Sequence, residues 1–366
     1  TAAGASPEAV EEAKHLFNPN ALTLGFARRF APYKRPNLLL YDPDRLLRLL
    51  SDPHRPVQLI LAGKAHPADQ AGQAMIREWI QFVRRPEVRP HVIFLSDYDM
   101  LLTEHLVQGV DVWINTPRRP WEACGTSGMK VLANGGLNLS ELDGWWAEAY
   151  TPEVGWALGD GREHGDDPAW DAAEAAALYG LLEGQVIPEF YNRGKQGIPT
   201  AWVKRMRESM AGLTAQFSAN RAVREYTEEH YLPAAAAYRA RAANKGAAGL
   251  QMVNWRQALE QNWAKLRFGE LHVVSDKDMH AFEVAVNLSK LDPNAIRVEL
   301  YADGVNGGAS DRHELSRARP SGEANGYIYS TQVPATRPVT DYTARIIPQY
   351  AGVAVPLEVS RILWQR

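Results

Sequence analysis

The sequence predicts an α/β protein in which a parallel sheet, covered by helices, precedes a helical segment and a small antiparallel β-sandwich. Three observations lead to this fold class. Short apolar runs alternate with segments of helical spacing between residues 22 and 140. Residues 165–245 are rich in helix formers, and from about residue 268 to 366 apolar and polar residues frequently alternate.

Four apolar runs in the first part are typical of buried strands, because they lack the polar alternation of a strand with one wet face. They are LTLGF (22–26), VQLILAG (57–63), HVIFLS (91–96) and VDVWIN (110–115). The segments between them predict helices over residues 37–50, 71–85 and 100–109. This alternation predicts a doubly wound, Rossmann-like domain, whose ligands bind beyond the carboxyl ends of the strands.

The second part of the chain divides at a change of composition. AANKGAAG (242–249) separates the helical segment from a last helix at 254–266 and the β-region. We therefore predict a first domain over residues 1–245, and a helix plus β-sandwich over 246–366. The acidic stretch EHGDD (163–167) has residues that could bind a metal, but a helix-capping segment is favoured, and we expect no metal site.

The overall composition argues against several classes of protein. The chain of 366 residues has a net charge of -3 and no apolar run long enough to cross a membrane, so neither nucleic acid nor a membrane is an expected partner. Its single cysteine excludes a disulfide within the chain and a cysteine-based zinc cluster. The N-terminus has no signal-peptide pattern and no initiator methionine. We expect part of a longer, cytoplasmic protein.

The loop EACGTSGMK (122–130) directly follows the fourth apolar run, and a helix is expected to begin near Ser127. Glycines let a backbone approach a ligand closely, so Thr126, Ser127 and the nearby amides could bind a phosphate. Lys130 would lie in the first turn of this helix. It could pair with an acid, bind pyridoxal phosphate covalently, or be a solvated lysine; local spacing alone favours the last reading.

A second cluster, ARRFAPYKR (27–35), follows the first apolar run. Arginine and lysine side chains at the carboxyl end of a strand make an anion site plausible, although a solvated basic turn has similar charge. The position in the sheet favours the anion site. Its cations are Arg28, Arg29, Lys34 and Arg35.

Together these segments resemble a known family. EACGTSGMKVLANGGLNLSELDGWW resembles the cofactor-lysine segment of the α-glucan phosphorylases, which include glycogen and maltodextrin phosphorylases. ARRFAPYKR resembles their phosphate-binding segment, LAGKAHPAD resembles another shared loop, and Tyr98 precedes Lys130 by the family's interval. The likeness extends from about residue 20 to 235. The tail, with ELYADG and DYTARIIP, resembles the extra domain of the shorter bacterial branch.

The resemblance implies reversible phosphorolysis of terminal α-1,4-linked glucose to glucose 1-phosphate, by an enzyme of the two-domain GT-B fold. The chain would be its C-terminal portion, with pyridoxal 5′-phosphate as cofactor and α-glucan and inorganic phosphate as substrates. The missing N-terminal domain, which supplies half of the glucan cleft, would be a further partner, and a homo-oligomer is left open. We expect that this chain alone retains the cofactor but does not turn over glucan.

The resemblance also assigns roles to individual residues. The cofactor would be held by Lys130 through a covalent bond, its 5′-phosphate by Thr126, Ser127 and Arg28, and its ring by Tyr98. The substrate phosphate would be held by Arg29 and Lys34, and the glucose hydroxyls by Glu122 and the amides near Cys124 and Gly125. Many relatives have serine in place of Cys124, and His-Glu in place of Ala31-Pro32.

Two other functions are compatible with parts of this sequence. A nucleotide-sugar glucosyltransferase of the glycogen-synthase type shares the GT-B fold, but it has no need of a lysine like Lys130. A non-catalytic carbohydrate-binding module would not need the cations and Glu122. Exposed tryptophans could stack on sugars in any of these proteins, but burial in the core is the commoner case. The candidates are Trp121, Trp145, Trp146 and Trp156.

Overall fold

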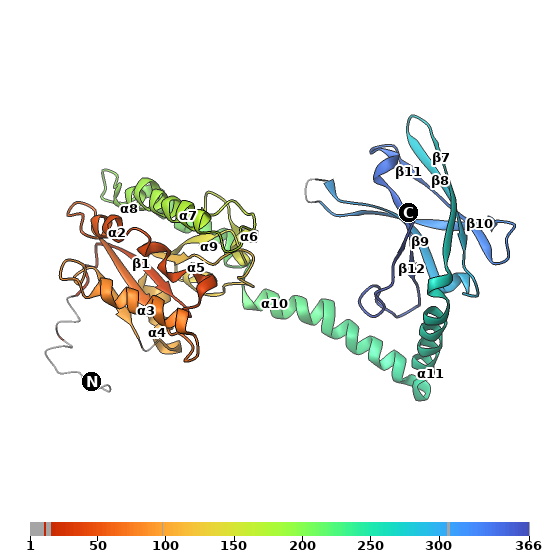
Figure 1. Cartoon of the computed structure of the whole chain (residues 1–366), viewed down its shortest axis with the longest axis horizontal. Coiled ribbons are helices and arrows are strands. Elements are labelled where there is room, and N and C mark those ends of the chain that lie inside the picture. Colours follow the sequence, from red (N-terminus) through yellow and green to blue (C-terminus); the bar gives the residue numbers. More distant parts are fainter. Residues whose placement is uncertain (1–10, 12–15, 97, 306–307, 366) are drawn as a thin grey trace. The chain divides into compact units, whose positions relative to one another are not determined.

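The computed structural model describes residues 11, 16–96, 98–305 and 308–365, and the chain divides into two compact units (Figure 1). The first unit comprises residues 1–224 and the second residues 225–366. Within the described residues, no helix combines the length and the apolar character needed to cross a bilayer.

The first unit is built on a parallel sheet of six strands in the order β3-β2-β1-β4-β5-β6. The strands are β1 (Leu22–Ala27), β2 (Val57–Ala62), β3 (Val92–Leu95), β4 (Val112–Asn115), β5 (Leu137–Glu141) and β6 (Gly155–Leu158). The order reverses between β1 and β4, as in a Rossmann-like sheet. The doubly wound prediction is therefore confirmed. The last two strands, β5 and β6, were not among the predicted strands.

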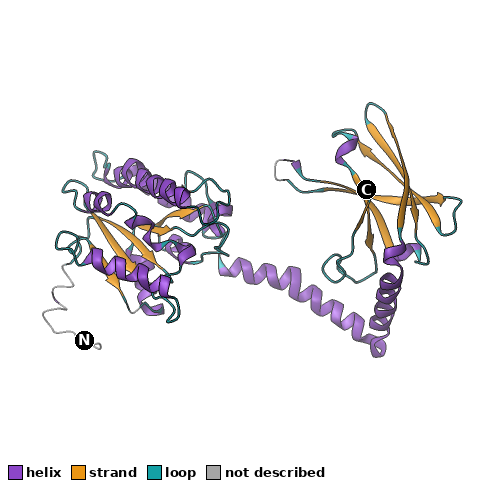
Figure 2. Cartoon of the chain, in the orientation of Figure 1, coloured by secondary structure: helices purple, strands orange, loops and turns teal. Residues whose placement is uncertain are grey.

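Helices lie on both faces of this sheet (Figure 2). They are α2 (Pro43–Leu50), α3 (Gln70–Val83), α4 (Met100–Gly109), α5 (Ser127–Ala133), α6 (Trp145–Ala149), α7 (Pro168–Leu181), α8 (Ile187–Tyr191) and α9 (Thr200–Leu213), with short 3₁₀ turns at Pro32–Lys34 and Pro36–Leu40 and a π turn at Leu182–Val186. The larger core cluster packs α2, α3, α7 and α9 on the strands, with Trp79 and Leu178 fully buried. A second cluster packs α4 and α5 around Trp113.

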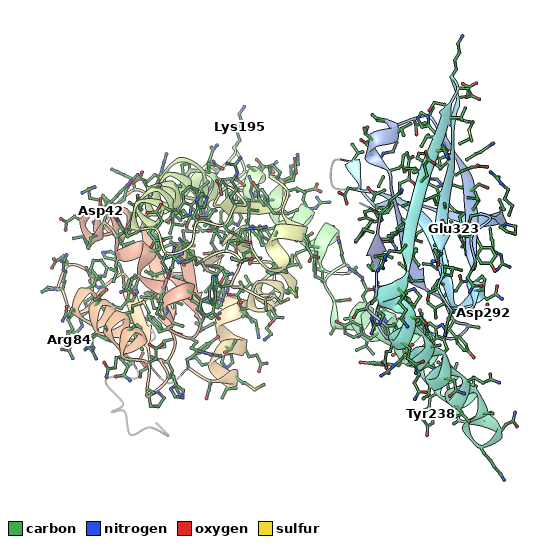
Figure 3. All side chains as sticks on the ribbon, turned by 45° about the vertical axis from the view of Figure 1, so that its right-hand side comes forward. Asp42, Arg84, Lys195, Tyr238, Asp292 and Glu323 are labelled. Carbon is green, nitrogen blue, oxygen red and sulfur yellow. The ribbon has the colours of Figure 1, made fainter. Side chains whose placement is uncertain are left out.

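Four of these helices begin with an aspartate whose side chain accepts a hydrogen bond from a backbone N–H of the first turn. The capping residues are Asp42 of α2 (labelled in Figure 3), Asp69 of α3, Asp99 of α4 and Asp167 of α7. The Oδ1 of Asp167 lies 2.9 Å from the amide nitrogen of Ala169. The capping interpretation of EHGDD is therefore confirmed.

The helical segment continues through α10 (Ala219–Glu225), a π turn (Tyr226–Tyr231) and α11 (Leu232–Asn262). Ala243–Gly246 interrupt α11 with non-helical backbone angles, and three of these residues have positive φ. The interruption falls within the AANKGAAG stretch, where the composition changes.

The second unit contains one curled antiparallel sheet of seven strands in the order β13-β12-β9-β10-β11-β8-β7. They are β7 (Arg267–Ser275), β8 (Met279–Asn287), β9 (Ile296–Ala302), β10 (Asp311–Pro320), β11 (Gly326–Pro334), β12 (Thr343–Pro348) and β13 (Leu363–Trp364); 3₁₀ turns occur at Trp263–Lys265, Pro293–Ala295 and Val339–Asp341. The antiparallel prediction is confirmed, but the two-layered sandwich is wrong. The buried face of this sheet is covered by its own curl and by Trp255 and Leu259 of α11.

Candidate functional site

The candidate site begins at the carboxyl ends of β1 and β4, where the strand order of the first sheet reverses. The two strands pair in parallel, with Leu24 opposite Val112. Arg28 follows the last residue of β1, and Asn115 ends β4. An Nη of Arg28 donates a hydrogen bond to Oδ1 of Asn115. These side chains therefore lie where doubly wound sheets bind their ligands.

Glu122 joins the two predicted loops. Its Oε2 forms a close ion pair with Arg28 and lies 3.1 Å from Nζ of Lys34. The three side chains are each about nine-tenths buried. Two cations therefore face one carboxylate in a cluster that is largely shielded from water, and the excess of positive charge favours an anion.

The electrostatics keep Glu122 ionised. Burial on its own would raise the pKa of Glu122, but the charges of Arg28 and Lys34 outweigh it and hold this pKa below its usual value. The backbone N–H of Glu122 donates to Oδ2 of Asp143 at 2.8 Å, which fixes the start of the loop. In the first loop, Nε of Arg28 is buried without a hydrogen-bond partner among the described residues. This orphaned donor suits an anion.

The backbone of the loop is held against the turn between β5 and α6. Gly125 has a φ of +82°, which favours glycine, and the carbonyl of Cys124 accepts a hydrogen bond from the N–H of Trp145 at 2.9 Å. A Cβ on Gly144 would lie only 2.4 Å from that carbonyl oxygen. The close approach of the two chains therefore requires glycine at position 144.

The helix α5 begins at Ser127, as predicted, and contains Lys130. The hydroxyl of Ser127 accepts a hydrogen bond from the indole N–H of Trp113 at 3.1 Å. Thr126 is exposed, and its side chain makes no capping hydrogen bond. Lys130 is exposed and forms no ion pair with any described residue. Its amine is thus available to a ligand.

The remaining predicted residues lie beside this cluster. Arg29 is exposed next to Arg28, and the half-buried Tyr98 donates from its hydroxyl to the carbonyl of Ala27 at 3.4 Å. Cys124 is an exposed residue, but its thiol is partly shielded from water. This partial burial first, and then the charges of Glu148 and Glu122, raise the pKa of the thiol. It is therefore a neutral group at physiological pH.

Arg35, predicted as one of four cations for an anion, has a different role in the structure. It is buried and forms ion pairs with Glu141, Asp171 and Glu174. Asn115 and Asp143 were not predicted as site residues. Asn115 could have been found from the sequence, because it is the polar last residue of a buried strand, where ligands bind in such sheets.

The four candidate tryptophans differ in the exposure of their side chains. Trp145, Trp146 and Trp156 are buried in the core. Trp121 is 66% exposed, and its ring centroid lies 6.4 Å from that of Tyr33. Only Trp121 is therefore free to meet a sugar.

Taken together, the residues fit a phosphorylated cofactor with an aldehyde beside a second anion. They offer the exposed amine of Lys130, the hydroxyl of Thr126, which makes no capping hydrogen bond, and the Nε of Arg28, which has no partner among the described residues. Among the described residues, no group of histidine, cysteine and carboxylate side chains has the arrangement of a metal site.

Comparison of the sequence with known proteins shows which family it matches. Residues 9–155 match the family model described as carbohydrate phosphorylase. The chain is 40% identical over 357 residues to a glycogen phosphorylase of Mycobacterium tuberculosis, covering 94% of this chain and 41% of the relative. It is 35% identical over 365 residues to a maltodextrin phosphorylase of Thermococcus litoralis, covering 97% and 43%.

A shorter match, 46% identical over 220 residues, is to a glycogen phosphorylase of Aquifex aeolicus and covers 60% of this chain and 31% of the relative. The chain therefore spans less than half the length of these curated relatives.

Proposed function

The chain belongs to the carbohydrate phosphorylase family, and on that premise we propose that it forms the cofactor- and phosphate-binding portion of an α-glucan phosphorylase. In the proposed reaction, inorganic phosphate displaces the glucan from C1 of a terminal α-1,4-linked glucose of glycogen, starch or maltodextrin. The bond between C1 and the glucan oxygen breaks, a bond between C1 and a phosphate oxygen forms, and the glucan oxygen takes a proton. The product is glucose 1-phosphate.

The observation that supports the proposal is the meeting of Arg28, Lys34 and Glu122 at the carboxyl ends of neighbouring strands, with Glu122 in the loop that leads into α5 and Lys130. A site that holds two phosphates side by side needs several cations, because the phosphates repel each other. The first loop provides them in Arg28, Arg29 and Lys34. Hydrolysis by a pair of carboxylates is less well supported, since Glu122 is already bound to two cations.

We propose pyridoxal 5′-phosphate as the cofactor. Lys130 would hold it covalently, Thr126, Ser127 and Arg28 would bind its phosphate, and Tyr98 would lie along its ring. When bound, this group supplies a phosphate that exchanges a proton with the substrate phosphate.

The other residues act on the substrate. Arg29 and Lys34 would bind the substrate phosphate and hold its negative charge beside C1, where positive charge develops as the glycosidic bond breaks. Glu122 would accept hydrogen bonds from glucose hydroxyls, together with the amides near Cys124 and Gly125. Because Gly144 lets the loop pack closely on the turn before α6, these amides are held in place before substrate arrives.

The decisive experiment is borohydride reduction of the chain after incubation with pyridoxal 5′-phosphate, followed by peptide mapping. We expect the reduced pyridoxyl group on Lys130 and no stable label in Lys130→Ala. Lys195→Ala is the matched control, because Lys195 (labelled in Figure 3) is also exposed in the same unit and lies outside the site. Labelling of another lysine, or equal labelling of Lys130→Ala, would contradict the proposal.

A second experiment concerns turnover. We propose that this portion is the C-terminal domain of a two-domain GT-B enzyme in the cytoplasm, so the chain alone should not phosphorolyse glucan. Adding the N-terminal portion of the enzyme should restore glucose 1-phosphate release. Efficient release by the chain alone would show that half of the expected glucan cleft is unnecessary. Nucleotide-sugar binding without pyridoxal phosphate would instead favour a synthase-type glucosyltransferase.

A further inference from the structure

Arg35 connects the loop that carries Lys34 to three other elements of the first unit. It lies between two 3₁₀ turns with φ 43° and ψ 52°, a left-handed conformation that is uncommon for a residue with a side chain. Its Nε donates to the carbonyl of Thr116 at 3.1 Å, and Nη2 donates to the carbonyl of Pro117 at 2.9 Å. The hydroxyl of Thr116 donates in turn to the carbonyls of Lys34 and Arg35, at 3.2 and 3.1 Å.

Three carboxylates also meet this guanidinium. Nη2 lies 3.1 Å from Oε2 of Glu141 at the end of β5, and Nη1 contacts Oδ1 of Asp171 at 3.0 Å and Oε2 of Glu174, both on α7. Asp171 has a second cation, Arg118, whose Nη2 is 2.8 Å from its Oδ2. Glu141 and Glu174 therefore share the single charge of Arg35.

The charges of this cluster do not balance if both glutamates are ionised. The side chains of Glu141 and Glu174 are only 4% and 3% exposed, so water screens neither of them. An unpaired buried carboxylate is costly, and such a group usually takes up a proton instead.

The geometry provides a place for that proton. The Oε2 atoms of both glutamates face Arg35, whereas Oε1 of Glu174 is buried without a hydrogen-bond partner among the described residues. A Cβ on Gly159 would lie 1.9 Å from Oε1 of Glu141 and 3.1 Å from Oε1 of Glu174. Both Oε1 atoms thus border the same small space, and two such oxygens can approach only if a proton lies between them.

We propose that Glu141 and Glu174 hold one proton between them, and that this carboxyl pair, through Arg35, positions the loop that presents Lys34 to Glu122. One proton leaves one negative charge on the pair to match the positive charge of Arg35. It also gives the orphaned oxygen of Glu174 a donor. Glu141, Glu174 and Arg35 are positioning residues, because among the described residues none of them forms an ion pair with Arg28, Lys34 or Glu122.

The charged groups around the pair agree with this protonation. Burial first, then the hydrogen bond and charge of Glu174, and finally the charge of Asp143 outweigh the opposing charge of Arg35 and raise the pKa of Glu141 to about 9. Asp171 is held ionised, because Arg118 and Arg35 outweigh its burial and lower its pKa. The proton therefore belongs to the glutamate pair and not to the aspartate.

Loss of the proton should loosen the loop. Above the pKa of Glu141, the cluster would contain one buried negative charge without a partner, and Arg35 could no longer hold all its acceptors. The protonated fraction falls about tenfold for each pH unit above this pKa. The stabilisation of the closed loop is fully present below the ordinary glutamate pKa of 4.5 and is lost as the pH rises to about 9. The population with an open loop should therefore rise by up to tenfold per pH unit below about 9 and level off above it.

Infrared titration of the full chain tests the proton directly. We expect the carbonyl band of a protonated carboxyl group at neutral pH, which disappears as the pH rises through about 9. Glu141→Gln should lose this band and keep the fold, because an amide donates to Glu174 in place of the proton. Glu183→Gln is the matched control, since Glu183 forms a surface ion pair with Arg45 in the same unit. Glu174→Gln serves as a second variant.

Hydrogen exchange of peptides spanning residues 28–38 tests the positioning. Relative to the unfolded-chain rate at each pH, exchange in the wild type should rise by up to tenfold per pH unit as the pH approaches about 9 and level off above it, and it should stay constant in Glu141→Gln. A wild type without the band, a band that survives both glutamine substitutions, or loop exchange that is independent of pH would overturn the proposal. Neither measurement uses pyridoxal phosphate, so both remain valid if the proposed function fails.

Discussion

Replacing Glu122 with glutamine should destabilise the first unit. The stability of the variant should then depend on the phosphate concentration. The substitution removes the carboxylate that lies 3.1 Å from Nζ of Lys34 and pairs with Arg28. At an effective dielectric constant of about 20, unit charges at that distance attract by about 5 kcal/mol. The three side chains remain about one-tenth exposed and glutamine keeps one acceptor, so the net loss should be about 3 kcal/mol.

Urea unfolding followed by tryptophan fluorescence measures this loss, because most of the 11 tryptophans lie in residues 1–224. Phosphate should stabilise the variant beyond what chloride does at equal ionic strength. At 100 times its dissociation constant, phosphate contributes about 2.7 kcal/mol, which would offset most of the loss. Glu183→Gln, at an exposed ion pair, should cost less than about 1 kcal/mol.

The same ion pair predicts a response to acid. Since the folded pKa of Glu122 is lowered, its contribution is fully present above the unfolded value of 4.5 and is lost as the pH falls through the folded value. Acid should therefore destabilise the wild type more than Glu122→Gln. The reasoning is refuted if Glu122→Gln is as stable as Glu183→Gln and phosphate has no more effect than chloride.

Two further predictions concern the framework of the site. Trp146→Ala should cost about 3–5 kcal/mol in urea unfolding because Trp146 is fully buried, whereas the exposed Trp121→Ala should stay within about 0.5 kcal/mol of the wild type; equal losses would contradict the burial of Trp146. Gly144→Ala should cost more than the roughly 1–3 kcal/mol of its left-handed backbone, because its Cβ would meet the carbonyl of Cys124. Gly161→Ala, with positive φ but open space around it, is the control, and an equal loss would exclude the clash.

The parallel sheet could be predicted only where its strands are uniformly apolar. LTLGF and VQLILAG have the continuous apolar character of strands buried on both faces. β5 is also buried, but it contains Asn138 and Ser140, whose side chains make hydrogen bonds to Gly128 and Asn115. In the sequence, such polar residues are typical of a loop. Only the structure shows the hydrogen-bond partners that allow them to lie in a buried strand. β6 has only four residues and begins with glycine.

In the second unit, alternation identified strands but not their layers. An alternating strand such as β8 has one buried face, whatever covers it. A second sheet and a curled sheet with a helix across it satisfy the same pattern. PLEVSRILW (356–364) was predicted as a strand, but only Leu363–Trp364 pair with β12. Most of the preceding residues are exposed or half-buried, and Val359 packs into the core of the unit, but none of them has a strand partner among the described residues.

Part of the site could be predicted, from the positions of strand ends and from the resemblance of two loops to a known family. Arg28, Lys34 and Glu122 follow strands that are neighbours in the sheet, so their meeting could be expected. Arg35 belongs to the same cationic run, but its acceptors come from positions 141, 171 and 174. A run of cations does not tell which of them faces an anion site and which is already paired by distant carboxylates.

The position of the single thiol has a practical consequence for handling the protein. Cys124 is exposed at the centre of the loop between Glu122 and Thr126. Air oxidation can join two molecules only through this sulfur, and a covalent dimer of that kind would press two such loops together. Preparations that lose ligand binding on storage should recover it on treatment with a reducing agent.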